Sequence, residues 1–314
     1  MQRHELWRLQ YRSNRYMQHL DEAALQQRAK DVFLNLLTIT EQNKIGLPPI
    51  QEGEEWMVLW TEVLEEFDIR YGPYPAGFEN GVITNQSLPL PNAPLAEKAA
   101  RAVMAAKVNG LEKGSYLVKY INSIFLESFR GGHIRIAPAS SYQDPSLNDA
   151  TRDEELELYI QPHPSFMRLD VIDQHSHQPK GRIYPRGNKI KKRAGSDYYL
   201  FCLSEVLIPR LFLDFDKDAC VIVKQPGEFY RKVVEAFERQ LKGWTAFAFS
   251  VAYIDPLKTS ISELDIYRQK HFRYAYQREL RFIFLPQRPI QKLEAFTVHL
   301  SEMPEMSQLR IADF

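Results

Sequence analysis

The chain has 314 residues, carries no net formal charge, and is 44% hydrophobic and 25% charged. These values are ordinary for a globular protein, and a net charge of zero gives no overall attraction to nucleic acid or to a membrane. No apolar signal region opens the sequence and no apolar run is long enough to cross a bilayer, so we expect a cytoplasmic protein without membrane contact. Cys202 and Cys220 stand in apolar stretches without CxxC spacing, which predicts two buried thiols.

The first third of the chain has the apolar spacing of helices. We predict helices over 21–43, 54–68 and 95–107, with Asn109-Gly110 as the stop of the last and a Pro-rich loop over 71–94. These elements form a helical N-terminal region over 1–112. We find no chemistry in it and expect a packing platform or an interaction region.

The remaining residues, 113–314, are rich in strands and have few helices. The pattern begins with a strand over 116–120, a helix over 123–130 capped by Asn122, the turn Gly131-Gly132 and a strand over 133–137. Further strands are predicted over 198–204, 219–224, 245–254 and 295–300, with a helix over 228–241. A helical region followed by a sheet with few helices is an α+β fold.

The segment over 270–286 is the most informative one. Its aromatic and branched residues predict a single strand that ends at Pro286. Because side chains alternate along a strand, Gln277, Glu279 and Arg281 would share one face, opposite an apolar face. A carboxylate on such a strand is costly unless its face meets water or a ligand. A sheet with one solvated face therefore stays open as an alternative to a binding site.

A basic segment over 174–196 contains no acidic residue. Its seven cations stand among Gly and Pro residues that predict a loop or a hairpin; they are Lys180, Arg182, Arg186, Lys189, Lys191, Lys192 and Arg193. The last four of them are our candidates for contacts with a phosphate backbone. A solvated, mobile loop is the alternative. His175 and His177 lack the cysteines and the spacing of a zinc site, and we expect no bound metal.

Familiar nucleotide-binding and hydrolase motifs are absent from the sequence. It contains no GxxxxGK[ST], GxGxxG, HExxH or GxSxG pattern, which argues against the enzyme classes that carry them. What remains is a set of polar residues on separate predicted strands: Lys119, Arg135, Ser204 and Glu279.

The order of these parts resembles the ADP-ribosyltransferase superfamily. Strand 116–120 with Lys119, the short helix, Gly131-Gly132 and strand 133–137 are similar to the opening of that fold. Strand 198–204 is similar to its aromatic strand with a serine, and Gln277-Arg278-Glu279 to its Gln-x-Glu. The layout also looks like the DarT-type and CmdT-type toxins that modify nucleic acid, and it shares motifs with the AbiGi-type abortive-infection family. The resemblance covers residues 115–290.

The resemblance implies a split, mainly antiparallel sheet over 113–314 as an ADP-ribosyltransferase-like catalytic domain, with NAD as co-substrate. Glu279 and Gln277 would be catalytic. Lys119 or Arg135 would hold the pyrophosphate, Tyr198 or Tyr199 would stack on nicotinamide, and Ser204 would orient the ribose. The expected activity is that of a toxin in phage defence or a toxin–antitoxin system. Its acceptor would be nucleic acid, RNA rather than DNA, and an antitoxin or inhibitor protein would bind it.

Two other functions remain open on the sequence. The first is an RNA-processing nuclease or phosphotransferase that uses His133, His175, His177 or His271 as acid and base. The second is a non-enzymatic interaction protein in which the helical region binds a partner.

Overall fold

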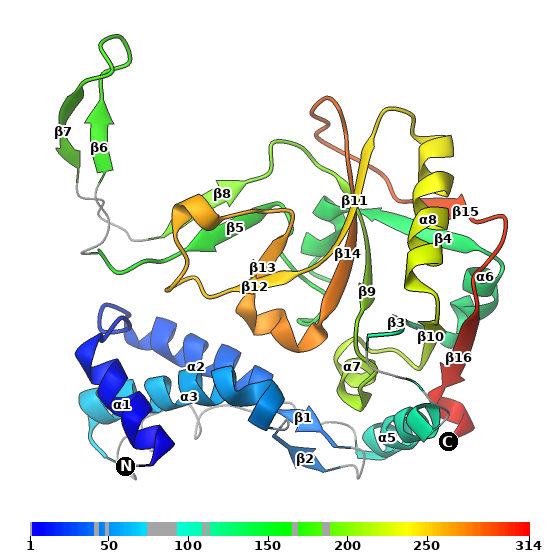
Figure 1. Cartoon of the computed structure of the whole chain (residues 1–314), viewed down its shortest axis with the longest axis horizontal. Coiled ribbons are helices and arrows are strands. Elements are labelled where there is room, and N and C mark those ends of the chain that lie inside the picture. Colours follow the sequence, from blue (N-terminus) through cyan, green and yellow to red (C-terminus); the bar gives the residue numbers. More distant parts are fainter. Residues whose placement is uncertain are drawn as a thin grey trace.

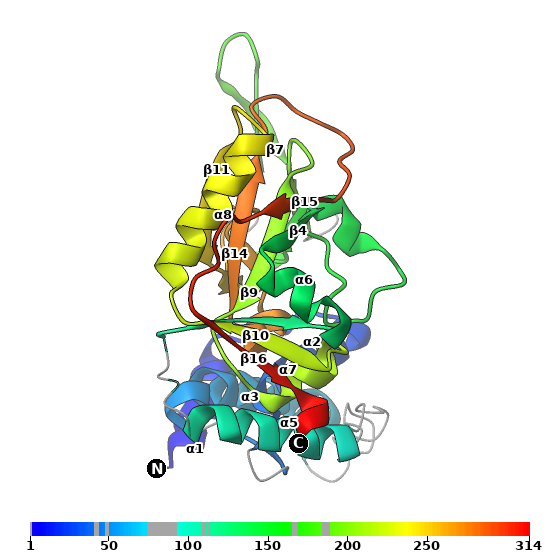
Figure 2. The same cartoon turned by 90° about the vertical axis from the view of Figure 1, so that its right-hand side faces the viewer.

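The computed structural model describes residues 2–40, 44–47, 50–73, 93–108, 111, 114–164, 169–183 and 189–314. Helices α1, α2 and α3 form a layer below an upright sheet, and the hairpin of β6 and β7 extends away from the body (Figure 1). The view from the side shows α8 along one face of that sheet (Figure 2). The structure is thus a mixed α+β fold with a mainly antiparallel sheet, as the sequence predicts at this level.

The N-terminal layer consists of α1 (Arg3–Ser13), α2 (Glu22–Leu36) and α3 (Ile50–Tyr71). Asp21 caps α2 by accepting a hydrogen bond from the backbone of Ala24. The predicted helix over 21–43 is wrong over residues 37–40, because the β-branched pair Thr38–Ile39 forms β1 and pairs with β2 (Ile45–Gly46). The last part of the prediction, over 41–43, lies outside the described residues. The sequence pattern missed α1, which is anchored by ion pairs such as Arg8 to Glu65 on α3.

Helix α5 (Ala93–Val108) belongs to the sheet body rather than to the N-terminal layer. Its buried face, which includes Ala99 and Val103, packs with α7 (Pro209–Asp214) and with the side chains of β3 and β10 on one side of the sheet. The predicted helix over 95–107 is confirmed. Its predicted stop at Asn109-Gly110 and most of the predicted loop over 71–94 lie outside the described residues.

Among the described residues, the largest sheet has eight strands in the order β11-β14-β9-β3-β10-β16, with β4 and β15 attached to β9. The strands are β3 (Leu117–Ile121), β4 (His133–Pro138), β9 (Tyr199–Ser204), β10 (Ala219–Val223), β11 (Thr245–Ser250), β14 (Glu279–Leu285), β15 (Phe296–His299) and β16 (Met306–Arg310). All of their pairings are antiparallel.

One edge of β9 is shared by two strands. Near its end, Ser204 pairs with Val118 of β3, and near its start Leu200 pairs with Ala137 of β4. Strands β3 and β4 therefore diverge from a common edge, and we call this place the fork. The sheet is split at the fork.

Helix α8 (Pro226–Gln240) covers the apolar face of the sheet. Phe229 and Phe237 of this helix are fully buried against Phe282 and Phe284 of β14. The helix that the sequence predicts over 228–241 and the apolar face that it predicts for β14 are thus confirmed.

The predicted single strand over 270–286 is wrong in its first half. It is divided into β13 (Gln269–His271), the 3₁₀ helix η5 (Phe272–Gln277) and β14, and Arg278 between them adopts a left-handed conformation at φ 45°. Strand β13 pairs in parallel with β12 (Ala252–Ile254), so the predicted strand over 245–254 is also two strands. The alternative of a solvated polar face is excluded, because Gln277, Glu279 and Arg281 are all buried.

The helical segment after β3 spans the predicted residues 123–130, but its first turn is a 3₁₀ helix and its cap is different. It consists of the 3₁₀ helix η1 (Ser123–Phe125) and α6 (Leu126–Arg130). Asn122 makes no capping bond; Asp218 instead accepts from the backbone and the hydroxyl of Ser123. The predicted glycine turn is confirmed at Gly132, where φ is 84° and a Cβ atom would lie 2.4 Å from the carbonyl oxygen of Leu300.

The basic segment forms parts of two hairpins. Strand β7 (Pro179–Ile183) pairs with β6 (Leu169–Ile172) in the projecting hairpin, and β8 (Ile190–Arg193) pairs with β5 (Glu157–Ile160) on the body. The side chains of Arg182 and Arg186 lie outside the described residues.

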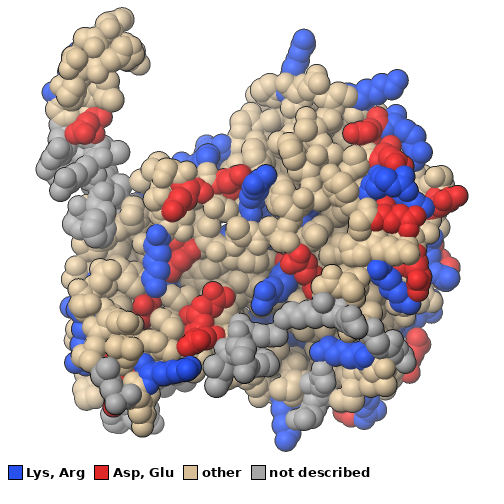
Figure 3. All heavy atoms as spheres, viewed as in Figure 1, with Lys and Arg blue, Asp and Glu red and all other residues tan. Residues whose placement is uncertain are grey.

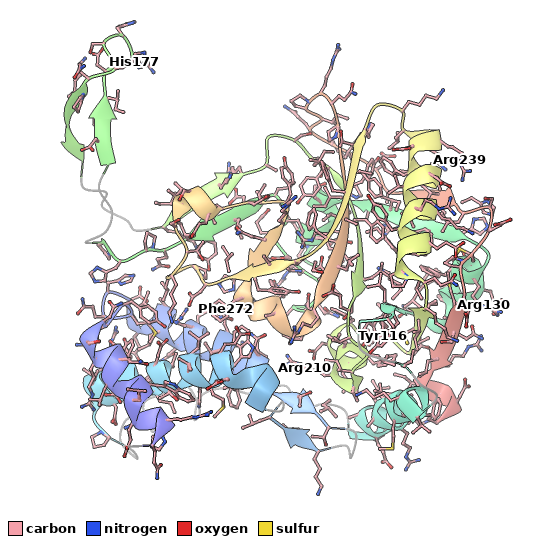
Figure 4. All side chains as sticks on the ribbon, in the orientation of Figure 1. Tyr116, Arg130, His177, Arg210, Arg239 and Phe272 are labelled. Atoms are coloured by element: carbon pink, nitrogen blue, oxygen red, sulfur yellow. The ribbon has the colours of Figure 1, made fainter. Side chains whose placement is uncertain are left out.

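The N-terminal layer is fastened to η5, the segment that leads into β14. On α2, the buried Arg28 donates to both carboxylate oxygens of Asp255, and Asn35 donates to the carbonyl of Phe272 and accepts from the backbone of Tyr276. Figure 4 shows Phe272 directed from η5 toward the helices, where its ring joins their core. The predicted packing platform therefore supports η5.

We expect Asn35→Ala to lower the free energy of unfolding by about 2 kcal/mol, because it leaves the buried backbone groups of η5 without their partner. Urea denaturation measures this loss. Gln26→Ala on the same helix is the matched control, since the half-buried Gln26 bonds to Glu22 one turn away and not to η5. Equal stability of the two variants would show that Asn35 does not anchor η5.

Candidate active site

A cavity of about 160 Å³ opens at the fork, between β3, β9 and β14. Its lining includes Lys119 from β3, Ser204 from β9 and Glu279 from β14, with Gln277 from the end of η5. Four residues that the sequence singles out on separate segments therefore meet in one cavity. The fork makes this possible, because β3 turns away from β9 after a single pairing and leaves space beside the sheet edge.

Glu279 lies in the cavity wall between two cations. Its Oε2 is 3.2 Å from Nζ of Lys270, and its Oε1 accepts from Nε of Arg281 at 2.8 Å. Burial raises the pKa of a carboxyl group, but Arg281 and Lys270 outweigh this effect and hold the pKa of Glu279 well below its usual range. Glu279 is thus a buried carboxylate that stays ionised at neutral pH.

A second carboxyl group, Glu155, shares the same cations. Its Oε1 accepts from Nη2 of Arg281 at 2.9 Å, and Nζ of Lys270 lies 3.6 Å away. Here burial prevails over the two cations and, with the nearby carboxylates of Asp153 and Glu279, raises the pKa of Glu155 to about 7. The two glutamates therefore differ in protonation although they contact the same arginine.

Lys119, Ser204 and Gln277 are held by backbone groups around the cavity. The ammonium of Lys119 donates to the carbonyl of Cys202 at 2.8 Å, and burial lowers its pKa. The hydroxyl of Ser204 donates to the carbonyl of Gln277 at 2.7 Å, and the Gln277 amide donates to the carbonyl of Ala150 at the same distance. These bonds fix three polar side chains around a small space.

Three of the expected ligand contacts lie elsewhere. Tyr198 and Tyr199 are buried, donate to the carbonyls of Glu155 and Glu294, and are not in the cavity lining. The ring of Tyr199 packs in the core under α8. Arg135 points to solvent from β4 and does not line the cavity either. The structure thus places Lys119 rather than Arg135 at the cavity, and neither tyrosine lines it.

Each of the four candidate cations for nucleic acid has a partner within the protein. Lys191 and Arg193 form ion pairs with Glu157, Lys192 donates to the carbonyl of Leu264, and Lys189 lies over the ring of Tyr159. On the face shown in Figure 3, basic side chains are interspersed with acidic ones over the described surface. All four cations are thus engaged with groups of the protein itself and do not form an open basic patch.

The histidines of the nuclease alternative are dispersed over the fold. His177 lies at the tip of the projecting hairpin (Figure 4), and His133 on β4 packs against His299. His271 on β13 is half-buried. Loss of solvent around the ring, followed by the charge of Arg273, lowers the pKa of His271 to about 3. The four histidines therefore lie on three separate segments, with His175 and His177 together on the projecting hairpin.

Sequence reasoning missed the residues that hold Glu279 in place. Lys270 is nine residues away in the chain and reaches Glu279 because β13 and β14 flank the 3₁₀ helix. Glu155 is far more distant in the chain and contacts Arg281 and Lys270, the two cations beside Glu279. The sequence signal that could have pointed to Glu155 is the acidic run Asp153-Glu154-Glu155, which stands just before the strand β5.

Comparisons with protein-family models, with curated proteins and with solved structures found no match to the chain. None of the helices in the described part of the chain is long and apolar enough to cross a membrane. Among the same residues, no group of three or more His, Cys, Asp or Glu side chains is placed to hold a metal ion.

Proposed function

We propose that this protein is an NAD-dependent ADP-ribosyltransferase whose cavity at the fork binds the nicotinamide–ribose end of NAD. The observation that supports this best is the buried, ionised Glu279 facing the same small cavity as Lys119, Ser204 and Gln277. These are residue types that the resemblance to the superfamily assigns to catalysis and NAD binding, and they come from four separate segments.

The chemistry of the reaction suits these side chains. When the bond between nicotinamide and ribose breaks, positive charge builds up on the sugar, as in glycoside cleavage. A carboxylate fixed in the wall stabilises that charge without reorganising, and Glu279 meets this condition because Arg281 and Lys270 hold it in place. Ser204 and Gln277 lie where they can orient the ribose.

The size and charge of the cavity limit which part of NAD it encloses. Its volume of about 160 Å³ is smaller than that of pockets that enclose a drug-sized ligand, which start at about 300 Å³. We therefore assign it the nicotinamide and its ribose, with the adenosine outside. Lys119 and Lys217 both line it and would bind the pyrophosphate by charge-assisted hydrogen bonds.

The biological role that we propose is that of a cytoplasmic toxin in phage defence or a toxin–antitoxin system. RNA is the acceptor that we favour over DNA, and an antitoxin or inhibitor protein would keep the chain inactive. These assignments follow from the resemblance to toxins that modify nucleic acid.

Incubation of the purified chain with labelled NAD and separate pools of RNA, DNA and cell protein tests the proposal. We expect release of nicotinamide and transfer of label to the RNA pool. Transfer of label to the protein pool alone would mean that the acceptor is protein and not RNA. RNA cleavage that needs no NAD, or a folded and inhibitor-free chain that releases no nicotinamide, would overturn the proposal.

A further inference from the structure

A second cavity lies next to the one at the fork. It has a volume of about 240 Å³ and is lined by residues that include Tyr159, Lys189, Lys191 and His271. Glu155 and Lys270 line both cavities, so these two side chains form the wall between them. A molecule in the second cavity would thus be separated from the first only by this pair.

Aromatic rings and cations in the second cavity suit an unpaired nucleotide. The rings of Tyr159 and His271 have centroids 5.8 Å apart, and Nζ of Lys189 is 3.7 Å from the centroid of Tyr159. Stacking on aromatic rings beside cations that meet the phosphates is how proteins bind single-stranded nucleic acid. Asp153, Glu154 and Glu157 line the same cavity and would repel further phosphates, so its charge suits one base with one flanking phosphate.

His271 gives this cavity a fixed hydrogen-bond donor. Its Nδ1 accepts from the backbone N–H of Arg273 at 3.1 Å, so in the neutral ring the proton is on Nε2. Burial, and then the charge of Arg273, lower the pKa of His271 to about 3, which keeps the ring neutral. The ring of His271 already stacks on Phe272, with centroids 4.8 Å apart. It would therefore meet the nucleotide through Nε2–H, which can donate to an acceptor atom on the base edge or the phosphate.

We propose that the second cavity binds an unpaired base of a single-stranded RNA acceptor, and that Glu155 accepts the proton of the attacking group through the shared wall. This inference depends on the proposed transferase activity. The bond from ribose C1′ to nicotinamide breaks, and its electron pair leaves with nicotinamide, which becomes neutral. A lone pair of the acceptor oxygen or nitrogen forms the new bond to C1′. The acceptor proton passes to Glu155 and then to solvent.

The groups around Glu155 allow it to exchange a proton near neutral pH. The charged groups that face it are Arg281 and Lys270, which favour its ionised form, and Asp153 and Glu279, which oppose it. Tyr142, Tyr198 and Cys202 also face it, and burial raises the pKa of each, so they stay neutral. Glu155 is therefore the group of this cluster that changes charge as the pH rises through about 7.

Binding can be tested without NAD. We expect labelled twelve-residue RNA homopolymers to bind the full chain in fluorescence anisotropy, and their duplexes to bind more weakly. Lys189→Ala and Tyr159→Ala should each weaken single-strand binding about tenfold, since stacking contributes about 1–3 kcal/mol per base. Lys224→Ala is the matched control, because Lys224 pairs with Glu305 away from both cavities. Equal affinity of all four proteins would overturn the binding site.

The role of Glu155 is tested by Glu155→Gln, with nicotinamide release and label transfer to the same RNA measured separately. Transfer should fall about 10²-fold, as for loss of a general base, and should lose its rise between pH 6 and 8. Transfer at the native rate and with the native pH profile would overturn this role. If the native chain releases no nicotinamide, the proposed transferase activity is wrong. The binding experiment would then still show whether the second cavity binds RNA. If Glu155→Gln does not fold, Glu155→Asp replaces it: its carboxylate is one methylene shorter, so transfer should slow while a rise with pH remains, and transfer at the native rate would overturn the role of Glu155.

Discussion

Glu279→Gln is expected to lower nicotinamide release by about 10³-fold without unfolding the protein. The amide has the size of the carboxylate but carries no charge, so it cannot stabilise the positive charge that builds up on the ribose. The fold should persist because Lys270 and Arg281 keep Asp153 and Glu155 as ion-pair partners. Nicotinamide release at saturating NAD, measured together with circular dichroism of both proteins, provides the comparison.

Glu205→Gln is the matched control for this experiment. It makes the same chemical change next to Ser204, at a carboxylate that accepts from the hydroxyl of Ser250 and does not line the cavity at the fork. We expect native turnover from this variant. If Glu279→Gln also keeps native turnover, the assignment of Glu279 is wrong.

Arg281→Met is expected to lower the free energy of unfolding by about 3–5 kcal/mol. Arg281 is fully buried and lies between Glu155 and Glu279. Its Nη2 is 2.9 Å from Oε1 of Glu155, and its Nη1 is 2.9 Å from Oε2. Without it, two buried carboxyl groups share only Lys270, so one must either take up a proton or remain uncompensated in the core. Urea denaturation at pH 7 measures the loss.

Two further variants separate charge from packing at this position. Arg239→Met on the exposed face of α8 should change stability by less than about 0.5 kcal/mol, since its one bond is to the carbonyl of His299. The double variant Arg281→Met/Glu155→Gln should recover part of the loss by removing one of the two charges. If the double variant is no more stable than Arg281→Met, the loss of stability comes from packing and not from the unpaired carboxylate.

The local patterns of the sequence predicted the layers of this fold well. Alternation placed Phe282 and Phe284 on one face and Glu279 and Arg281 on the other, because packing under α8 fixes the register of β14. The strand with Lys119, the glycine turn and α8 followed from the same reasoning. Such signals are local, and they determine which residues can be buried.

The same patterns failed where distant contacts decide the structure. Residues 272–277 have strand-like composition but form η5, because α2 supplies partners for their backbone through Asn35. Tyr198 reads as a candidate for a stacking contact, yet its ring fills the core beside Glu155. Lys270 reads as an ordinary strand residue, yet its ammonium group lies within 3.6 Å of the carboxyl groups of Asp153, Glu155 and Glu279. No spacing along the chain encodes these contacts.

The fork also has a consequence for how the protein is made. Strand β9 meets β3 on one edge and β14 on the other, and the cavity between them needs residues from Lys119 to Glu279, which span half of the chain. Pairings between such distant segments form slowly, and domains fold as the ribosome releases them, at about 5–20 residues per second. A nascent chain that ends before β14 lacks one wall of the cavity. Translation thus has to pass residue 285 before the cavity at the fork has all of its walls.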